Sequence, residues 1–279
     1  MKHEEGFLNK NGDQKVFYQG WLPEGDLKAV LLVVHGLAEH CGRYMNVVNH
    51  FVPLGYGIYG FDLPGHGKSH GKRVYVNRFE DYTRTLSTFL DKVRTLHHEA
   101  PLFLVGHSMG SLVSAVFLTH RQEDFSGAIL SGPGAVKVPN SISSATILAG
   151  KVFSAVMPKI GLIRLDADGV SRDPSVVRAY VEDPLVYTGK TTARLAAEIL
   201  RAMQGIPREA NRITLPILLL QGGADKLVDP DGAGMLFETV QSSDKTLKMY
   251  DGLYHEIFNE PERDQVLGHM EQWLENHMH

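Results

Sequence analysis

A single serine carries the strongest chemical signal in the chain. Ser108 lies at the centre of Gly106–Gly110, which reads Gly-His-Ser-Met-Gly and fits a Gly-x-Ser-x-Gly pattern. This pattern is typical of a nucleophile elbow, where a sharp turn between a strand and a helix exposes a serine hydroxyl. Glycines on either side relieve the clashes that the strained turn would otherwise cause. We therefore expect Ser108 to be a nucleophile and the backbone N–H of Met109 to be one oxyanion donor.

A serine nucleophile needs a histidine base, and the histidine needs an acid that fixes its tautomer. Where a serine lies on such an elbow, both partners follow it in the chain, the acid first. Asp225 comes just after the apolar run 215–220 and is the leading acid. Asp229 is the weaker candidate, because a helix cap explains an aspartate before a proline. His255, just after the last predicted strand, is the candidate base.

A second oxyanion donor is expected in the loop that follows the apolar strand 29–34. This loop runs from His35 to His40, and Leu37 is its best candidate because it follows His35 and Gly36. The backbone N–H groups of Leu37 and Met109 would act together. We expect His35 and the histidine that precedes Ser108 to be structural, holding the loop and packing the elbow.

The elements that must position these residues alternate between strand and helix, which predicts an α/β domain. An Asn-Gly-Asp turn at 11–13 joins the first two strands in a hairpin. Strands are expected at 6–8, 15–21, 29–34, 57–61, 101–105, 127–130, 215–220 and 246–250, and helices at 43–52, 81–96, 111–118, 231–240 and 263–277.

The alternation stops after Gly132. From 133 to 207 we expect no buried strand, and the apolar residues follow helical spacing. The segment is too long for an ordinary loop. We therefore predict an α/β core formed by residues 1–132 and 208–279, with residues 133–207 inserted as a helical cap.

Composition excludes several classes of function. The net charge of −4 and the lack of a basic stripe argue against a nucleic-acid partner. The single cysteine, Cys41, allows no disulfide within the chain and favours a reducing compartment. Neither a signal peptide nor an apolar run long enough to span a membrane is evident. We expect a cytoplasmic protein that needs no metal or cofactor and touches membranes at most peripherally.

Several motifs together resemble monoacylglycerol lipases of the bacterial type, within the α/β-hydrolase superfamily. They are the segments 35–40, 62–69, 106–110, 171–174, 222–228 and 254–263. The resemblance implies a mostly parallel eight-stranded sheet flanked by helices, with an inserted helical cap. It also implies cofactor-free hydrolysis of one fatty acyl ester on glycerol by Ser108, Asp225 and His255, with Leu37 and Met109 as the oxyanion hole.

The resemblance also suggests residues of the substrate pocket. Glu39 and Arg43 match positions near the glycerol end, although an ion pair that holds the loop would explain them equally well. Phe258 stands where mammalian members carry a histidine. Apolar cap residues could line a tunnel for the fatty chain, face a bilayer or pack on the core. They are Ile147, Leu148, Val152, Phe153, Val156, Met157, Ile160 and Leu162.

Other functions use the same residues. A lysophospholipase, a broad carboxylesterase or a thioesterase would need the same three side chains, and a rate profile over these substrate classes separates them. A non-catalytic lipid sensor on the same fold is the alternative from another class. The presence of all three triad candidates argues against such a sensor. The sequence leaves the oligomeric state open.

Overall fold

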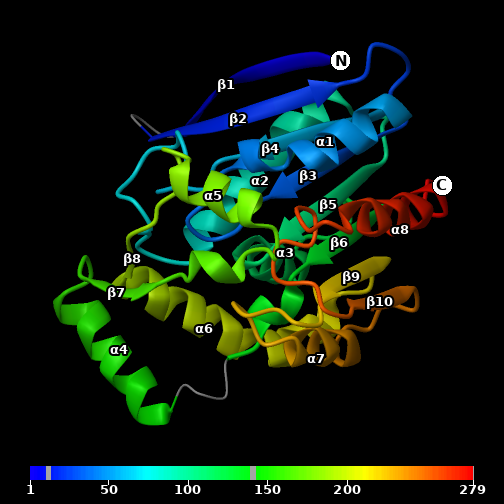
Figure 1. Cartoon of the computed structure of the whole chain (residues 1–279). Helices are drawn as coiled ribbons and strands as arrows, with labels where there is room; N and C mark the ends of the chain where they lie inside the picture. The colour runs from blue at the N-terminus through cyan, green and yellow to red at the C-terminus, as the bar shows by residue number, and fades with distance from the viewer. Residues whose placement is uncertain (11–13, 139–142, 279) are drawn as a thin grey trace.

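A sheet of eight strands runs through the computed structural model of the chain, which describes residues 1–10, 14–138 and 143–278 (Figure 1). β1 pairs antiparallel with β2, and β2 with β4, whereas the later neighbours in the sheet run parallel. The expected mostly parallel eight-stranded sheet is confirmed. In order across the sheet, the strands are β1 (Lys2–Lys10), β2 (Gln14–Leu22), β4 (Tyr56–Phe61), β3 (Ala29–Val34), β5 (Leu102–His107), β6 (Gly127–Ser131), β9 (Ile217–Gly222) and β10 (Lys245–Tyr250).

Helices cover both faces of this sheet, because its central strands are apolar on both sides. Along β3, Val30 and Leu32 pack into one core and Leu31 and Val33 into the other. The first core includes side chains of α2 (Glu80–Leu96), α3 (Met109–Leu118) and α7 (Asp231–Thr239). The second includes side chains of α1 (Met45–Phe51) and α8 (Arg263–Glu275). The result is the three-layer arrangement that buried parallel strands require.

The first third of the chain departs from its predicted element boundaries. β1 and β2 are both longer than predicted, and the turn predicted at 11–13 lies outside the described residues. The single helix predicted over 43–52 is instead divided between α1 and two 3-10 turns, η1 (Cys41–Arg43) and η2 (Val52–Leu54). Gly55, with φ of 97°, ends the last turn in the left-handed conformation that glycine adopts easily.

The insertion contains a strand pair that the sequence analysis missed. β7 (Gly161–Arg164) and β8 (Lys190–Thr192) form a short antiparallel ladder, and β7 is only partly buried, so the expectation of no buried strand did not include this pair. Strands of three and four residues are too short to produce a clear period-two pattern. The other elements of the insertion are η3 (Pro133–Val136), α4 (Ser144–Val156), η4 (Ala167–Gly169), α5 (Pro174–Glu182) and α6 (Ala193–Glu209).

The last helix of the insertion crosses the predicted boundary with the core. α6 continues through Pro207, the last residue of the predicted insertion, to Glu209. Ile206 and, just beyond the helix, Ala210 are buried in the first core, and their burial offsets the hydrogen bond that the proline removes. In Figure 1, α6 lies between α4 and the body of the molecule. The division into core and cap therefore stays a prediction, and its second boundary falls inside this helix.

None of the helices in the described ranges is both long enough and apolar enough to cross a bilayer.

Candidate active site

Ser108 occupies a strained turn between β5 and α3. Its φ of 54° and ψ of −120° are rare for a residue with a side chain, and such backbone strain costs about 1–3 kcal/mol. The turn is held from both sides by glycines. A β-carbon on Gly106 would lie 2.7 Å from Gly110 O, and one on Gly110 would lie 2.0 Å from Val34 O. The two glycines are therefore required by the packing of α3 against the sheet.

Asp225 and His255 meet at the ends of neighbouring strands. Asp225 follows β9 and His255 follows β10, and His255 Nδ1 lies 2.7 Å from Asp225 Oδ2. Asp225 Oδ1 accepts hydrogen bonds from the backbone N–H of Leu227 and of Val228 at 2.8 and 3.1 Å. Burial raises the pKa of the Asp225 carboxyl, but His255 and these hydrogen bonds outweigh it, so the pKa falls below its usual value. Asp225 therefore stays ionised beside the histidine.

Asp229, the weaker acid candidate, has a different environment. Its Oδ1 accepts the backbone N–H of Asp231 at the start of α7, and its Oδ2 lies 2.7 Å from Lys137 Nζ. The helix-start role expected for Asp229 agrees with these contacts.

The serine and the histidine flank the same glycine. A β-carbon on Gly132 would lie 3.3 Å from His255 Cε1 and 3.6 Å from Ser108 N. Ser108 and His255 also line one cavity of about 150 Å³. The structure thus brings together the three residues predicted as the triad, although their catalytic roles stay predictions.

The charge state of His255 follows from its surroundings. Burial alone would lower the pKa of the imidazole, but the Asp225 carboxylate raises it, with smaller contributions from Glu256 and Glu39, to above its usual value. The neighbouring His107 ring, 4.9 Å from that of His255, is different, because burial lowers its pKa to about 3. His107 is therefore neutral and contacts Ser131 Oγ at 3.1 Å, which agrees with the packing role expected for it.

Leu37 and Met109 line the same cavity as Ser108. Met109 is the first residue of α3, so its N–H has no acceptor within the helix. Within the described parts of the chain, the N–H of Leu37 donates to no protein acceptor either. Both groups are therefore free to donate to an oxyanion next to Ser108, and their role as an oxyanion hole stays a prediction.

Leu37 lies on the loop 35–40, the oxyanion loop. Glu39 Oε1 accepts the Gly36 N–H at 2.6 Å, and its Oε2 lies 2.9 Å from Arg43 Nη1. His35 Nε2 accepts the Leu63 N–H at 2.9 Å, in keeping with its expected structural role. The structure therefore contains the ion pair between Glu39 and Arg43 that was considered as an alternative to substrate contact. Glu39 also lines the cavity at Ser108, so its contact with substrate stays a prediction.

Glu256 is a site residue that sequence reasoning missed. Its two carboxylate oxygens accept hydrogen bonds from Arg43 Nη1 at 2.6 Å and Nη2 at 2.8 Å. It also lines the cavity at Ser108. The one signal available in the sequence was a carboxylate directly after the candidate base.

A second, larger cavity adjoins the one at Ser108. It measures about 450 Å³, lies among α4, α6 and β7, and is almost entirely apolar. The two cavities are neighbours, because four residues line both of them: Leu37, Leu165, Ile199 and Met203.

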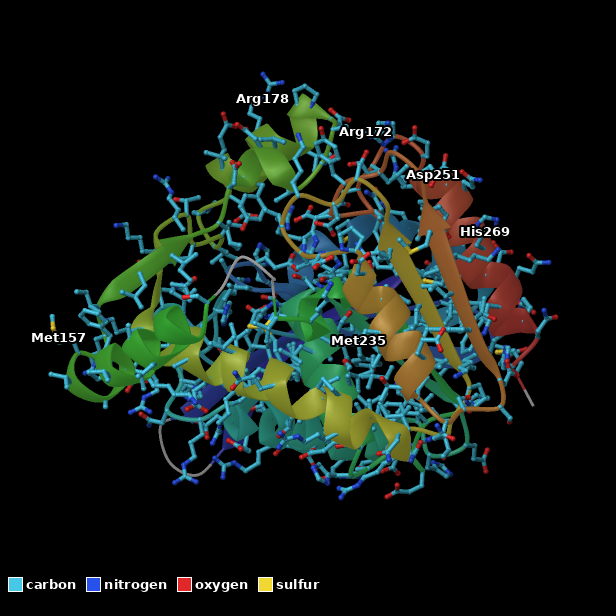
Figure 2. The ribbon with its side chains drawn as sticks, turned by 90° about the horizontal axis from the view of Figure 1, so that it is seen from below. Met157, Arg172, Arg178, Met235, Asp251 and His269 are labelled. Carbon is cyan, nitrogen blue, oxygen red and sulfur yellow. The ribbon has the colours of Figure 1, made fainter. Side chains whose placement is uncertain are left out.

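The cap residues predicted for the pocket divide into different groups. Phe153 lines the apolar cavity and is 45% exposed. Val156 and Met157 line neither cavity, and Figure 2 shows Met157 at the outer tip of the insertion, pointing away from the body. Their assignment to the pocket is corrected, because helical spacing does not tell which side of α4 meets the core. The side chain of Ile147 lies outside the described residues.

Phe258 is also misplaced by the prediction. It is buried in the second core, beside His107, and lines a small cavity with Arg43 rather than the one at Ser108. Its ring is apolar and therefore packs in the core next to His107 instead of lining the cavity at Ser108. Among the described residues no group of three histidine, cysteine or acidic side chains could hold a metal ion.

This geometry predicts how acyl transfer at Ser108 depends on pH. Neutral His255 is needed to accept the serine proton, so kcat/KM for a chromogenic ester should rise with pH to a plateau. Because the pKa of His255 is raised, the midpoint should lie above about 6.5. In Asp225→Asn the midpoint should move to lower pH and kcat should fall by about 10³–10⁴-fold. Asp229→Asn is the matched control and should leave both unchanged; an unmoved midpoint in Asp225→Asn would refute the pairing.

Comparison with known proteins agrees with this site. The family model described as serine aminopeptidase, S33, matches residues 25–262. A monoacylglycerol lipase of Mycolicibacterium smegmatis is 37% identical over 96% of this chain and 95% of its own, and a monoglyceride lipase of Rattus norvegicus is 39% identical over 96% and 88%. The crystal structure of a Paleococcus ferrophilus monoacylglycerol lipase, 32% identical, superposes with a TM-score of 0.84 over 94% of this chain and 99% of its own. The chain belongs to the monoacylglycerol lipase family of the α/β-hydrolase superfamily.

Proposed function

We propose that this protein is a serine hydrolase that cleaves monoacylglycerols into a fatty acid and glycerol. The observation that carries the proposal is the adjacency of two cavities. A small chamber with Ser108 and His255 at its wall adjoins a larger apolar cavity. The names of the relatives that are 37% and 39% identical support the same reaction.

The proposed reaction has two steps. Ser108 Oγ attacks the ester carbonyl while His255 takes its proton, and the imidazolium returns that proton to glycerol as it leaves. A water molecule activated by His255 then releases the fatty acid from the serine. Asp225 stabilises the imidazolium, and the N–H groups of Leu37 and Met109 bind the oxyanion in both steps.

The chamber favours a small neutral alcohol. Its ionisable side chains, among the described residues, are the carboxylates Glu39 and Glu256, the histidines His107 and His255, and the phenol of Tyr180. Without a lysine or arginine in this lining, a phosphate ester would meet negative charge and no counter-ion. This argues against the lysophospholipase alternative. Glycerol hydroxyls can instead donate to Glu39 or bond with the Tyr180 hydroxyl.

The apolar cavity suits the fatty chain. Each methylene group that it removes from water is worth about 0.8 kcal/mol, so long chains gain the most. α6 contributes small and aliphatic residues to the lining of this cavity, among them Ala196, Ala197 and Leu200.

The insertion is proposed to act as a cap that also touches membranes. Its exposed apolar side chains include Val156, 74% exposed, and Met157, 46% exposed. Phe153 and Ile163 are exposed and also line the apolar cavity, so this surface is continuous with the proposed acyl site. Apolar side chains beside Lys151 and Lys159 match the interface of an anionic bilayer. The cytoplasmic location expected from the sequence stays a prediction.

The first test of the function is removal of the nucleophile. Ser108→Ala should lower the turnover of monoacylglycerols by at least about three orders of magnitude, because the nucleophile is lost, and should leave the fold intact. Labelling by a fluorophosphonate should disappear in the same variant. A wild-type protein that is neither labelled nor active would support the lipid-sensor alternative. Faster hydrolysis of lysophospholipid or acyl-CoA than of monoacylglycerol would refute the proposed substrate.

A second test shortens the acyl site. Ala197→Phe places a ring in the apolar cavity, away from Ser108. We expect kcat/KM for an 18-carbon monoacylglycerol to fall by about tenfold or more, with little change for a two-carbon p-nitrophenyl ester. Gln204→Phe is the matched control, because Gln204 is an exposed residue of the same helix. Equal effects on both substrates would contradict the assignment of this cavity to the fatty chain.

The membrane proposal is tested with vesicles of phosphatidylcholine and phosphatidylglycerol. The double variant Val156→Asp and Met157→Asp should reduce the bound fraction at least about tenfold, since each side chain contributes about 1.5–3 kcal/mol when buried. Hydrolysis of a water-soluble ester should not change. Leu96→Asp removes an exposed apolar side chain from α2 of the core and should not affect binding. Vesicle binding that survives the double variant would exclude this surface.

A further inference from the structure

Three charged side chains lie together at the cavity that contains Ser108, and none of them takes part in the proton transfer or acyl transfer of the proposed reaction. They are Glu39, Arg43 and Glu256, whose side chains are between 5% and 10% exposed. Buried charges lose their hydration, and a buried ion pair is often no more stabilising than apolar residues of similar size. A contribution to stability is therefore a weak explanation for three buried charged side chains.

Arg43 joins two loops that are far apart in the sequence. On one side, Nη1 reaches Glu39, whose other oxygen holds the Gly36 N–H of the oxyanion loop. On the other side, Nη1 and Nη2 form a two-point contact with Glu256, which directly follows His255. The two residues of this second contact, Arg43 and Glu256, are 213 positions apart in the chain.

The partners of the bridge are themselves held. The Glu256 N–H donates to Val170 O at 2.8 Å, and its side chain accepts from Asn259 Nδ2 at 2.9 Å. Tyr44 donates its hydroxyl to Glu39 Oε1 at 2.9 Å. The guanidinium of Arg43 lies 4.6 Å from the centre of the Tyr180 ring. Each charged group therefore has a defined orientation.

These contacts leave Arg43 poorly suited to bind substrate. Both of its terminal nitrogens donate to carboxylates, and Tyr180 packs against its plane. These hydrogen bonds use three of the five N–H groups of the guanidinium, so most of its donor capacity is already taken by carboxylates. Arg43 lines only the small cavity that also contains Phe258, and not the chamber at Ser108.

We propose that Glu256 is a positioning residue that acts through Arg43 and Glu39 to hold the oxyanion loop in place relative to His255. During attack on the carbonyl, the Leu37 N–H must bind the oxyanion while His255 accepts the serine proton at the same reaction centre. A displacement of about 1 Å between such groups can cost about a hundredfold in rate. The inference rests on the proposed catalytic roles of Ser108, His255 and Leu37, but not on the identity of the alcohol.

The test compares Glu256→Gln, Glu39→Gln and their combination, with p-nitrophenyl butyrate as substrate. Glutamine keeps the shape but loses the charge and one acceptor oxygen. Each single variant should lower kcat by about 10- to 100-fold and leave KM within about twofold, because the lost interaction matters in the transition state. The double variant should be no slower than the slower single variant, since both break one bridge.

A second readout reports on the oxyanion site itself. A butyryl trifluoromethyl ketone forms a tetrahedral adduct whose oxyanion occupies the same site as the transition state, so its inhibition constant should rise by the same factor as kcat/KM falls. Glu262→Gln changes a more exposed carboxylate further along the chain and is the matched control, expected to behave as wild type. Should Glu256→Gln fail to fold, Arg43→Lys carries the test, because a lysine keeps the charge but cannot make the two-point contact.

Three outcomes would overturn the inference. They are an unchanged kcat, an effect on KM alone (which would indicate a substrate contact) and losses that multiply in the double variant. A wild-type protein that hydrolyses the butyrate ester but not monoacylglycerols would refute the proposed substrate and leave this test valid. Loss of butyrate hydrolysis in Ser108→Ala is the separate check on the nucleophile.

Discussion

The backbone of α3 touches the backbone of β3, and the geometry of the whole site depends on that contact. A side chain at Gly110 would collide with Val34 O, so only glycine lets the helix come this close. This approach keeps Ser108 at a positive φ, and the Ser108 N–H bond to Ser131 O at 2.9 Å ties the turn to the next strand. Packing of α3 against the buried sheet therefore offsets the free energy of the strained turn. The start of α3 also places the Met109 N–H beside the serine.

The carboxylates around His255 serve two purposes at once. Asp225, Glu256 and Glu39 all favour the protonated imidazole, which is the form that would appear while a serine proton is transferred. The latter two also make the chamber at Ser108 unfavourable for an anionic head group. Because Arg43 is hydrogen-bonded to both of them, its charge is engaged and does not attract a phosphate. We propose that one arrangement of charges thereby affects both rate and substrate choice.

The insertion has a part held on the core and a part that extends away from it. Near the site, the Glu256 N–H bonds Val170 O, the Tyr187 N–H bonds Ala38 O, and Arg172 pairs with Glu260. These contacts connect the insertion to the oxyanion loop and to the loop that carries His255. α4, in contrast, exposes much of its apolar surface and lies at the edge of the molecule (Figure 1). The wall of the small chamber is thus fixed, while the far end of the apolar cavity faces outward.

The sequence by itself determined the fold class and the members of the candidate triad. Local signals suffice for these, since a glycine-flanked serine between a strand and a helix defines its own turn, and parallel strands end at one edge of the sheet. Only the tertiary structure decided that α6 continues through Pro207, that Val156 and Met157 point outward, and that Phe258 belongs to the core. The bridge from Glu39 through Arg43 to Glu256 could not be predicted from the sequence either. The reason is physical: periodicity shows that a face is apolar, but which surface covers it, and which distant charges meet, depends on packing between elements.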